Sequence, residues 1–247
     1  MRAVRAIARR EFAAYFGSPT AYVLLAVYLT LSGYFFYSDV AFFVTFGAQV
    51  LETGLWRYVF IDFRLVTLLV LPLVTMRLFA EERKLGTIEL LWTLPVRDYQ
   101  LILGKFLAAW GFFLVTLVLA MIPFAVFYVY HPFALGPPTA GFLGLLLLGT
   151  AFIACGLAAS TLTENQVVAA MVTYGILVFF WFMTWNEAVG SEWIVRVLLL
   201  LSLFDHYYSF ATGSIQTADL AYFALFTLFF LYAGLRSLQS RAWRGVV

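Results

Sequence analysis

Uncharged stretches long enough to cross a lipid bilayer recur along this chain, and they constrain its fold more than any other feature. Residues 106–130, for example, contain no charged side chain, and about 20 apolar helical residues cross a bilayer core. Across the whole chain 64% of residues are hydrophobic and 11% are charged, whereas a soluble domain carries roughly 25% charged residues. The sequence therefore predicts an all-α, polytopic membrane protein.

The apolar pattern predicts six membrane-spanning helices, at about residues 19–38, 58–80, 101–130, 139–160, 166–185 and 218–236. The second of these has a short uncharged centre between Arg64 and Arg77. We therefore expect both arginines to extend along the helix toward the two membrane surfaces. On this interpretation no charged residue lies in the middle of a span, which argues against an ion-coupled carrier.

Two further segments are predicted to lie at the membrane surfaces. The outer segment, residues 186–217, contains an apolar run at residues 194–204 that as a helix would be roughly 16 Å long, about half a bilayer core. It is therefore predicted to be re-entrant. Residues 1–16 are predicted to form an amphipathic interface helix. Its basic stripe contains Arg2, Arg5 and Arg9, and its apolar stripe contains Val4, Ile7, Ala8, Phe12 and Tyr15.

The distribution of basic residues predicts the orientation. The N-terminal segment, residues 76–105 and the C-terminal tail together hold 12 of the 15 Lys and Arg residues. Because basic residues accumulate on the cytoplasmic side, both termini are predicted to be cytoplasmic and the number of spans to be even. The membrane would be the bacterial inner membrane.

The loop at residues 81–100 is dense in charge and longer than a simple connection needs. Two acids, Glu81 and Glu82, follow the second span at a helix C-terminus, where the helix dipole disfavours them. A short amphipathic helix is predicted next, and its exposed apolar side chains indicate a protein-binding surface, the alternative being a helix that rests on lipid. The candidate coupling residues are Glu81, Glu82, Arg83, Lys84, Gly86, Thr87, Ile88, Glu89, Leu91, Trp92, Pro95, Arg97 and Asp98.

The run ERKLGTIELLWTLPV, followed by GKFL, resembles the type-2 permeases of ATP-binding-cassette (ABC) transporters, and most closely the gliding-motility-associated permease subgroup. In that family the short helix is a coupling helix that docks on the nucleotide-binding subunit. The sequence departs from the family at Trp92, where a smaller aliphatic residue is expected. The residues that take the family's positions are Gly86, Thr87, Glu89, Leu90, Leu91, Pro95, Gly104 and Lys105.

The resemblance implies a permease subunit of an ATP-driven exporter, which is not itself an enzyme. ATP and Mg would be bound by a separate ATPase, present in two copies, because the chain lacks a Walker motif: Tyr99 stands where its first glycine should be. The expected partners are this ATPase, a second identical or related permease half and membrane lipid, but no nucleic acid. The substrate stays open. The alternatives are a structural or assembly subunit, or a channel or secondary carrier without an ATPase.

Other candidate sites carry weak signals. His131 and His206 lack a metal-ligand spacing, so no metal site is predicted. Ser214 has no surrounding nucleophile elbow. The single cysteine, Cys155, excludes an intrachain disulfide. No catalytic residue is therefore predicted.

Overall fold

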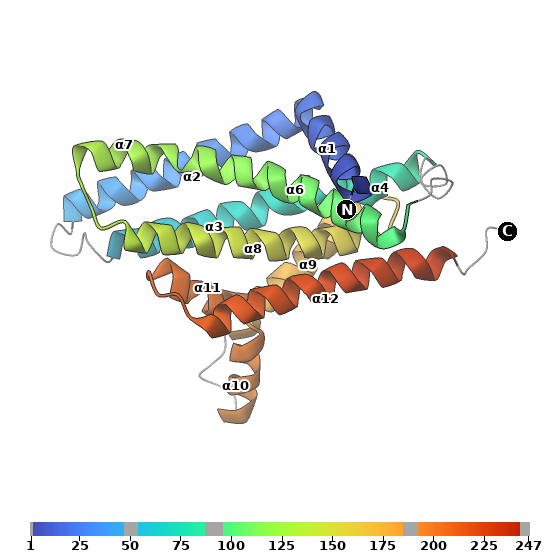
Figure 1. Ribbon diagram of the computed structural model, residues 1–247. Coiled ribbons are helices and arrows are strands. Elements are labelled where there is room, and N and C mark those ends of the chain that lie inside the picture. Colours follow the sequence, from blue (N-terminus) through green and yellow to red (C-terminus); the bar gives the residue numbers. More distant parts are fainter. Residues whose placement is uncertain (1, 47–53, 87–95, 185–191, 243–247) are drawn as a thin grey trace.

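The structure is a computed structural model, and it describes residues 2–46, 54–86, 96–184 and 192–242. Every regular element within these ranges is a helix (Figure 1). The elements are α1 (Arg2–Gly17), α2 (Pro19–Phe46), α3 (Gly54–Thr75), α4 (Arg77–Lys84), α6 (Asp98–Ala120), α7 (Ile122–Tyr130), α8 (Gly136–Ser160), α9 (Gln166–Trp181), the 3-10 helix η2 (Phe182–Thr184), α10 (Glu192–Leu201), α11 (Leu203–Ala211) and α12 (Thr217–Ala242).

Five stretches of the described residues are long and apolar enough to cross a membrane. The remaining predicted span, at residues 166–185, corresponds to α9, which has 16 residues and is about 24 Å long at 1.5 Å per residue, somewhat less than a bilayer core. The count of six spans therefore stays a prediction. The five long stretches are Pro19–Thr45, Gly54–Lys84, Asp98–Tyr130, Gly136–Ser160 and Thr217–Ser240.

Several helices extend beyond the predicted spans. Helix α2 passes Asp39 and continues to Phe46, and α12 continues into the basic tail as far as Ala242. A charged residue ends the apolar part of a span, but it does not end the helix, because the backbone hydrogen bonds continue into the aqueous layer. The predicted outer segment contains two short helices, α10 and α11, which meet at Ser202. The Ser202 side chain accepts a hydrogen bond from Asp205 N and begins α11.

Two long stretches are interrupted near a proline. Pro72 lies inside α3, and the helix breaks at Met76 before resuming as α4. Pro123 lies in the first turn of α7, directly after the break at Met121. Proline removes one backbone donor and disfavours a straight helix, which is consistent with an interruption close to each proline.

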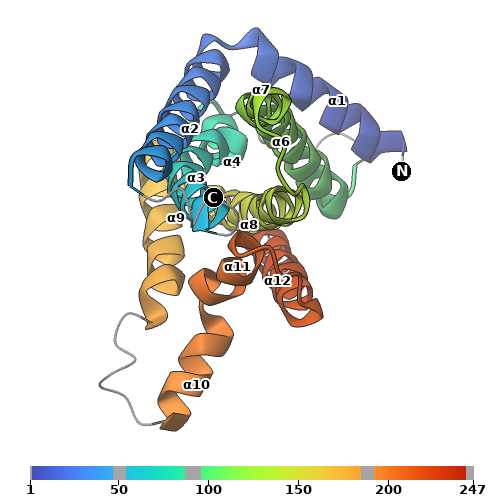
Figure 2. The same ribbon diagram turned by 90° about the vertical axis from the view of Figure 1, so that its left-hand side faces the viewer.

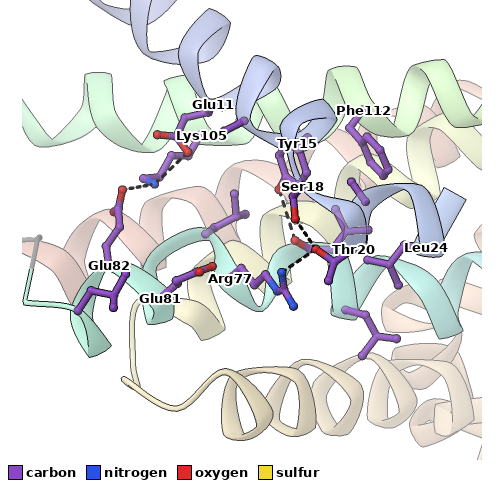
Figure 3. A pocket seen from close by; sticks show the side chains of 16 residues that line it. Glu11, Tyr15, Ser18, Thr20, Leu24, Arg77, Glu81, Glu82, Lys105 and Phe112 are labelled. Atoms are coloured by element: carbon purple, nitrogen blue, oxygen red, sulfur yellow. Dashed lines mark hydrogen bonds and ion pairs between the residues drawn. The ribbon is translucent and has the colours of Figure 1, made fainter.

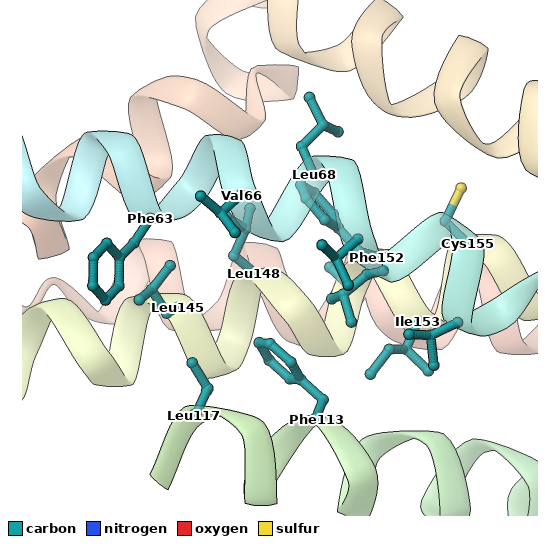
Figure 4. Close-up of a cluster of buried hydrophobic side chains, with 14 of the residues drawn as sticks. Phe63, Val66, Leu68, Phe113, Leu117, Leu145, Leu148, Phe152, Ile153 and Cys155 are labelled. Atoms are coloured by element: carbon teal, nitrogen blue, oxygen red, sulfur yellow. The ribbon is translucent and has the colours of Figure 1, made fainter. Parts of the chain in front are cut away.

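Helix α8 is the centre of the bundle, and α3, α6, α9, α11 and α12 pack against it (Figure 2). Small residues allow this close packing. A Cβ atom at Gly149 would lie 2.0 Å from the ring of Phe113, so α6 could not approach α8 as closely if the residue were larger. Side chains of α3, α6 and α8 meet in one buried apolar cluster, in which Phe63, Phe113 and Phe152 interdigitate with leucines such as Leu145 (Figure 4).

The start of α1, the end of α4, the start of α6 and the end of α12 lie at one end of the bundle, on the right of Figure 1. This arrangement agrees with the predicted grouping of the basic segments on one side of the membrane. Helix α1 packs along the first half of α6. The predicted apolar stripe of α1, which includes Ile7 and Phe12, is half-buried, whereas Arg2, Arg5 and Arg9 are exposed.

Candidate coupling site

The described part of the predicted coupling segment lies where α4 ends and α6 begins. Glu81, Glu82, Arg83 and Lys84 form the last turn of α4. Gly86 follows with a φ of 69°, a left-handed conformation that ends the helix, and glycine adopts it without steric cost. The segment that contains Thr87, Ile88, Glu89, Leu90, Leu91, Trp92 and Pro95 lies outside the described residues, so the predicted coupling helix and its apolar face stay a prediction.

At the other end of the loop, α6 starts at Asp98, next to Arg97. The start of α6 is stabilised by Gln100, whose side-chain oxygen accepts a hydrogen bond from Arg97 N at 3.1 Å. Arg97 is exposed and Asp98 half-buried. Both ends of the loop are therefore fixed by ordinary helix-terminal geometry, and both face the same end of the bundle.

A buried lysine joins the loop base to the N-terminal helix. Lys105 on α6 has a side chain that is 2% exposed, and its Nζ lies 2.7 Å from Glu82 Oε1 on α4 and 3.4 Å from Glu11 Oε2 on α1 (Figure 3). Arg10 lies 2.8 Å from the other Glu11 oxygen. The two carboxylates balance the two cations. One ion-paired cluster, Lys105 with Glu11, Glu82 and Arg10, therefore connects three helices.

The cluster accounts for an acid at an unfavourable helix terminus. Helix dipoles disfavour Glu82 at the end of α4 by about 0.3–1 kcal/mol, but Lys105 offers it a short charge-assisted hydrogen bond, worth about 1.5–3 kcal/mol. At Glu11, burial alone would raise the pKa, but Lys105 and Arg10 outweigh it, so the pKa of this carboxyl lies below its usual 4.5. Glu11 is therefore ionised at neutral pH.

Close contact between α1 and α6 depends on the residue next to Lys105. A Cβ atom at Gly104 would lie 2.6 Å from Ile7 Cγ2, so glycine permits the approach that brings Glu11 to Lys105. Sequence reasoning identified Gly104 and Lys105 as motif residues but did not include Lys105 or Glu11 in the candidate site. One feature of the sequence could have indicated a role for Glu11, because it is the only acidic residue among the first 38.

A second buried charge corrects one prediction. Arg64 on α3 is 5% exposed, so its side chain is enclosed within the bundle and does not extend out of it as predicted. Its guanidinium carbon lies 4.1 Å from the ring centroid of Trp181 and 4.2 Å from that of Phe204. Aromatic rings attract a desolvated cation, and these two come from α9 and α11. The argument against an ion-coupled carrier assumed that the Arg64 charge extends to the end of a span, and the enclosed position of this side chain removes that support.

The outer histidine of α11 has a protein partner. His206 Nδ1 lies 2.7 Å from Asp219 Oδ1 on α12, and the contact joins α11 to the start of the last long helix. Within the part of the chain that the structure describes, no three His, Cys, Asp or Glu side chains are grouped so that they could hold a metal ion.

These features define a multi-pass helical membrane protein with an ion-paired cluster at the base of a charged loop. Residues 5–197 match the family described as ABC-2 family transporter protein. The chain belongs to this family, whose members are membrane transport subunits. The match is to the family as a whole and does not distinguish the gliding-motility subgroup. No curated protein is significantly similar to the chain.

Proposed function

We propose that this chain is the permease half of an ATP-driven exporter in the bacterial inner membrane, with six spans that include α9. In this proposal both termini and residues 81–100 are cytoplasmic. A separate ATPase, present in two copies, binds ATP and Mg, and a second identical or related permease half completes the path. The gliding-motility-associated subgroup stays the closest resemblance. The observation that carries the proposal is the family match, which includes the whole loop at residues 81–100.

The ion-paired cluster gives this loop a way to move the rest of the protein. A force on residues 87–95 would reach the end of α4, because the loop continues directly from it. Glu82 would pass the displacement to Lys105 on α6 and through it to Glu11 on α1. A buried, ion-paired contact resists separation more than an exposed one. The three helices would therefore shift together when the ATPase closes on ATP.

Docking on the ATPase is expected to depend on the apolar face of Ile88, Leu91 and Trp92. Replacing both Leu91 and Trp92 with Ala should remove at least about 3 kcal/mol of apolar burial, which corresponds to a roughly hundredfold weaker association. Co-purification of the ATPase from native membranes measures this effect. The matched control is the Leu162→Ala and Val167→Ala double variant, which removes two exposed apolar side chains, one in the neighbouring α8–α9 connection and one in the first turn of α9. If both variants retain the ATPase equally well, docking uses another surface.

Glu89→Gln should leave co-purification of the ATPase intact, since it changes a charge and not the apolar face. The variant should instead uncouple ATP hydrolysis from transport, which is measured by comparing the rates of the two. Glu164→Gln, in the α8–α9 connection, is its control.

The topology is tested independently. After replacement of Cys155, the free buried cysteine, a single cysteine introduced after residue 242 should resist a membrane-impermeant thiol reagent in sealed cells. A cysteine at Tyr130, an exposed residue at the opposite end of the bundle, should react. Labelling of the tail cysteine from outside would contradict the cytoplasmic assignment of the C-terminus and the even number of spans.

The buried Arg64 favours a second candidate function. A charge within a span is a common feature of carriers that move ions or charged substrates, so a secondary carrier without an ATPase stays an alternative, beside a structural or assembly subunit. Co-purification of an ATPase supports the permease over both alternatives, and a membrane complex without one would support them.

A further inference from the structure

A cavity of about 360 Å³ lies next to the ion-paired cluster, between α1, α2, α3, α4 and α6 (Figure 3). Its size falls within the range of about 300–1,000 Å³ that is common for small-molecule sites. The proposed function leaves this cavity without a role. Its position, at the end of the bundle that we assign to the cytoplasm, places it at the level of the inner leaflet.

Polarity changes along the length of the cavity. Toward the end of the bundle it is lined by Ser18, Thr20, Arg77 and Glu81. Deeper in the bundle the lining is apolar, and Leu24 lies one helical turn beyond Thr20, about 6 Å further along α2. Figure 3 shows this order, with Glu81 and Arg77 on one side and Leu24 and Phe112 on the other. A ligand that fits both parts has a polar head and an apolar chain.

Two charges in the cavity are available to such a head. Glu11 and Glu82 are occupied by Lys105. In contrast, Arg77 uses Nη1 to donate to Thr20 Oγ1 at 2.7 Å, and its other guanidinium nitrogens have no hydrogen-bond partner among the described residues. Glu81 has neither a hydrogen bond nor an ion pair within the described part of the chain. The cavity therefore presents one available cation and one available anion.

Arg77 and Glu81 are four residues apart on α4, so their Cβ atoms are about 6 Å from each other on one helix face. They do not form an ion pair with each other, as judged across the described residues. A ligand group that carries a phosphate and an ammonium joined by a short linker would contact both at once. Arginine recognises phosphate through several N–H groups, and a carboxylate accepts hydrogen bonds from a primary ammonium.

We propose that this cavity binds an inner-leaflet phospholipid with a zwitterionic headgroup, in which Arg77 contacts the phosphate and Glu81 contacts a primary ammonium. An acyl chain of the lipid extends from the headgroup along the apolar wall that contains Leu24 and Phe112. An anionic lipid would leave Glu81 unpaired beside its phosphate. Free phosphate would leave the apolar wall unused. The inner-leaflet assignment rests on the proposed topology, whereas lipid binding itself goes beyond the proposed function, since it needs no ATPase.

Native mass spectrometry of the purified chain tests this with lipids of identical acyl chains. Phosphatidylethanolamine should be retained at least about tenfold better than phosphatidylglycerol, as expected for one charge-assisted contact. Glu81→Gln should abolish this preference by weakening phosphatidylethanolamine alone, and Arg77→Gln should weaken both lipids. Excess inorganic phosphate should displace neither. The control is Arg236→Gln, which changes an arginine on α12 that also donates to one hydroxyl, Tyr232 OH at 2.7 Å, but lies outside the cavity.

Equal retention of the two lipids would overturn the proposal, as would an unchanged preference in Glu81→Gln or an equal loss in the Arg236→Gln control. Displacement by inorganic phosphate would instead identify a free-phosphate site. Because Arg77 also bonds to Thr20, its replacement can disturb the fold, so the unfolding midpoint of each variant is measured. Among the described residues the Glu81 side chain has no hydrogen bond or ion pair that its replacement could break, so Glu81→Gln is the variant that tests the headgroup contact without a change in the fold. Since the ATPase is absent from this experiment, its result is independent of the proposed function.

Discussion

Lys105→Met is expected to destabilise the end of the bundle that we assign to the cytoplasm by about 3 kcal/mol, because it removes the buried cation that lies between the carboxylates of Glu82 and Glu11. Removing one partner of a buried ion pair costs about 3–5 kcal/mol. The lower value applies here, since the side chains of Glu82 and Glu11 are 19% and 18% exposed and regain some hydration. The loss is measured as a lower unfolding midpoint in detergent.

Two controls separate charge from packing at this position. Adding Glu82→Gln to Lys105→Met should recover a large part of the loss, since the pair is then removed together. Lys84→Met, at the exposed end of α4, should change stability by less than about 0.5 kcal/mol. If the Glu82→Gln addition recovers nothing, the lysine acts through its apolar stem and not through its charge.

The pH dependence follows from the lowered pKa of Glu11. A carboxyl whose pKa is lower in the folded state stabilises that state above its unfolded value, here 4.5. This contribution is lost as the pH falls through the lowered folded-state pKa. The stability difference between the wild type and Lys105→Met should therefore be largest at neutral pH and shrink in acid, where protonation of the carboxylates also relieves the variant.

The sequence predicted the apolar centres of the spans better than their ends. Uncharged runs report which part of a helix lies in lipid. Only at the short connection between α8 and α9 did they also place the helix ends, Ser160 and Gln166, as observed. They do not report where a helix stops in water, which is why α2 was predicted to end before Asp39. The ends depend on local backbone hydrogen bonds that a hydropathy pattern does not contain.

The candidate site was predicted in part for a similar reason. Gly86, a residue of the predicted site, ends α4, and this role is encoded locally because only glycine adopts a left-handed backbone without steric cost. The pairing of Lys105 with Glu11 joins residues 94 positions apart, and neither flanking sequence encodes it. The surroundings of Arg64 come from Trp181 and Phe204, far along the chain. A short apolar centre therefore suggested that this side chain reaches the surface, whereas tertiary packing encloses it.

Arg64→Ala is expected to lower stability by about 2–4 kcal/mol, while Arg64→Met should stay within about 1 kcal/mol of the wild type. The Arg64 side chain fills the space between the rings of Trp181 and Phe204, and Ala would leave a cavity there. Met keeps most of the volume and makes favourable sulfur contacts with aromatic rings. Unfolding midpoints in detergent compare the two variants.

We expect Met to be tolerated because burying the charge of Arg64 costs desolvation free energy. Within the described residues, the buried Nε and Nη1 of Arg64 have no hydrogen-bond partner. Two desolvated cation–π contacts stabilise the folded state by about 2 kcal/mol each, whereas desolvation of the guanidinium costs several kcal/mol. The carboxylates of Asp62 and Asp205 attract the guanidinium without forming an ion pair with it. If Arg64→Met is as damaging as Arg64→Ala, these attractions stabilise the fold. If it is not, the charge is unnecessary for folding, and a transport defect in Arg64→Met would then assign it to the transport step.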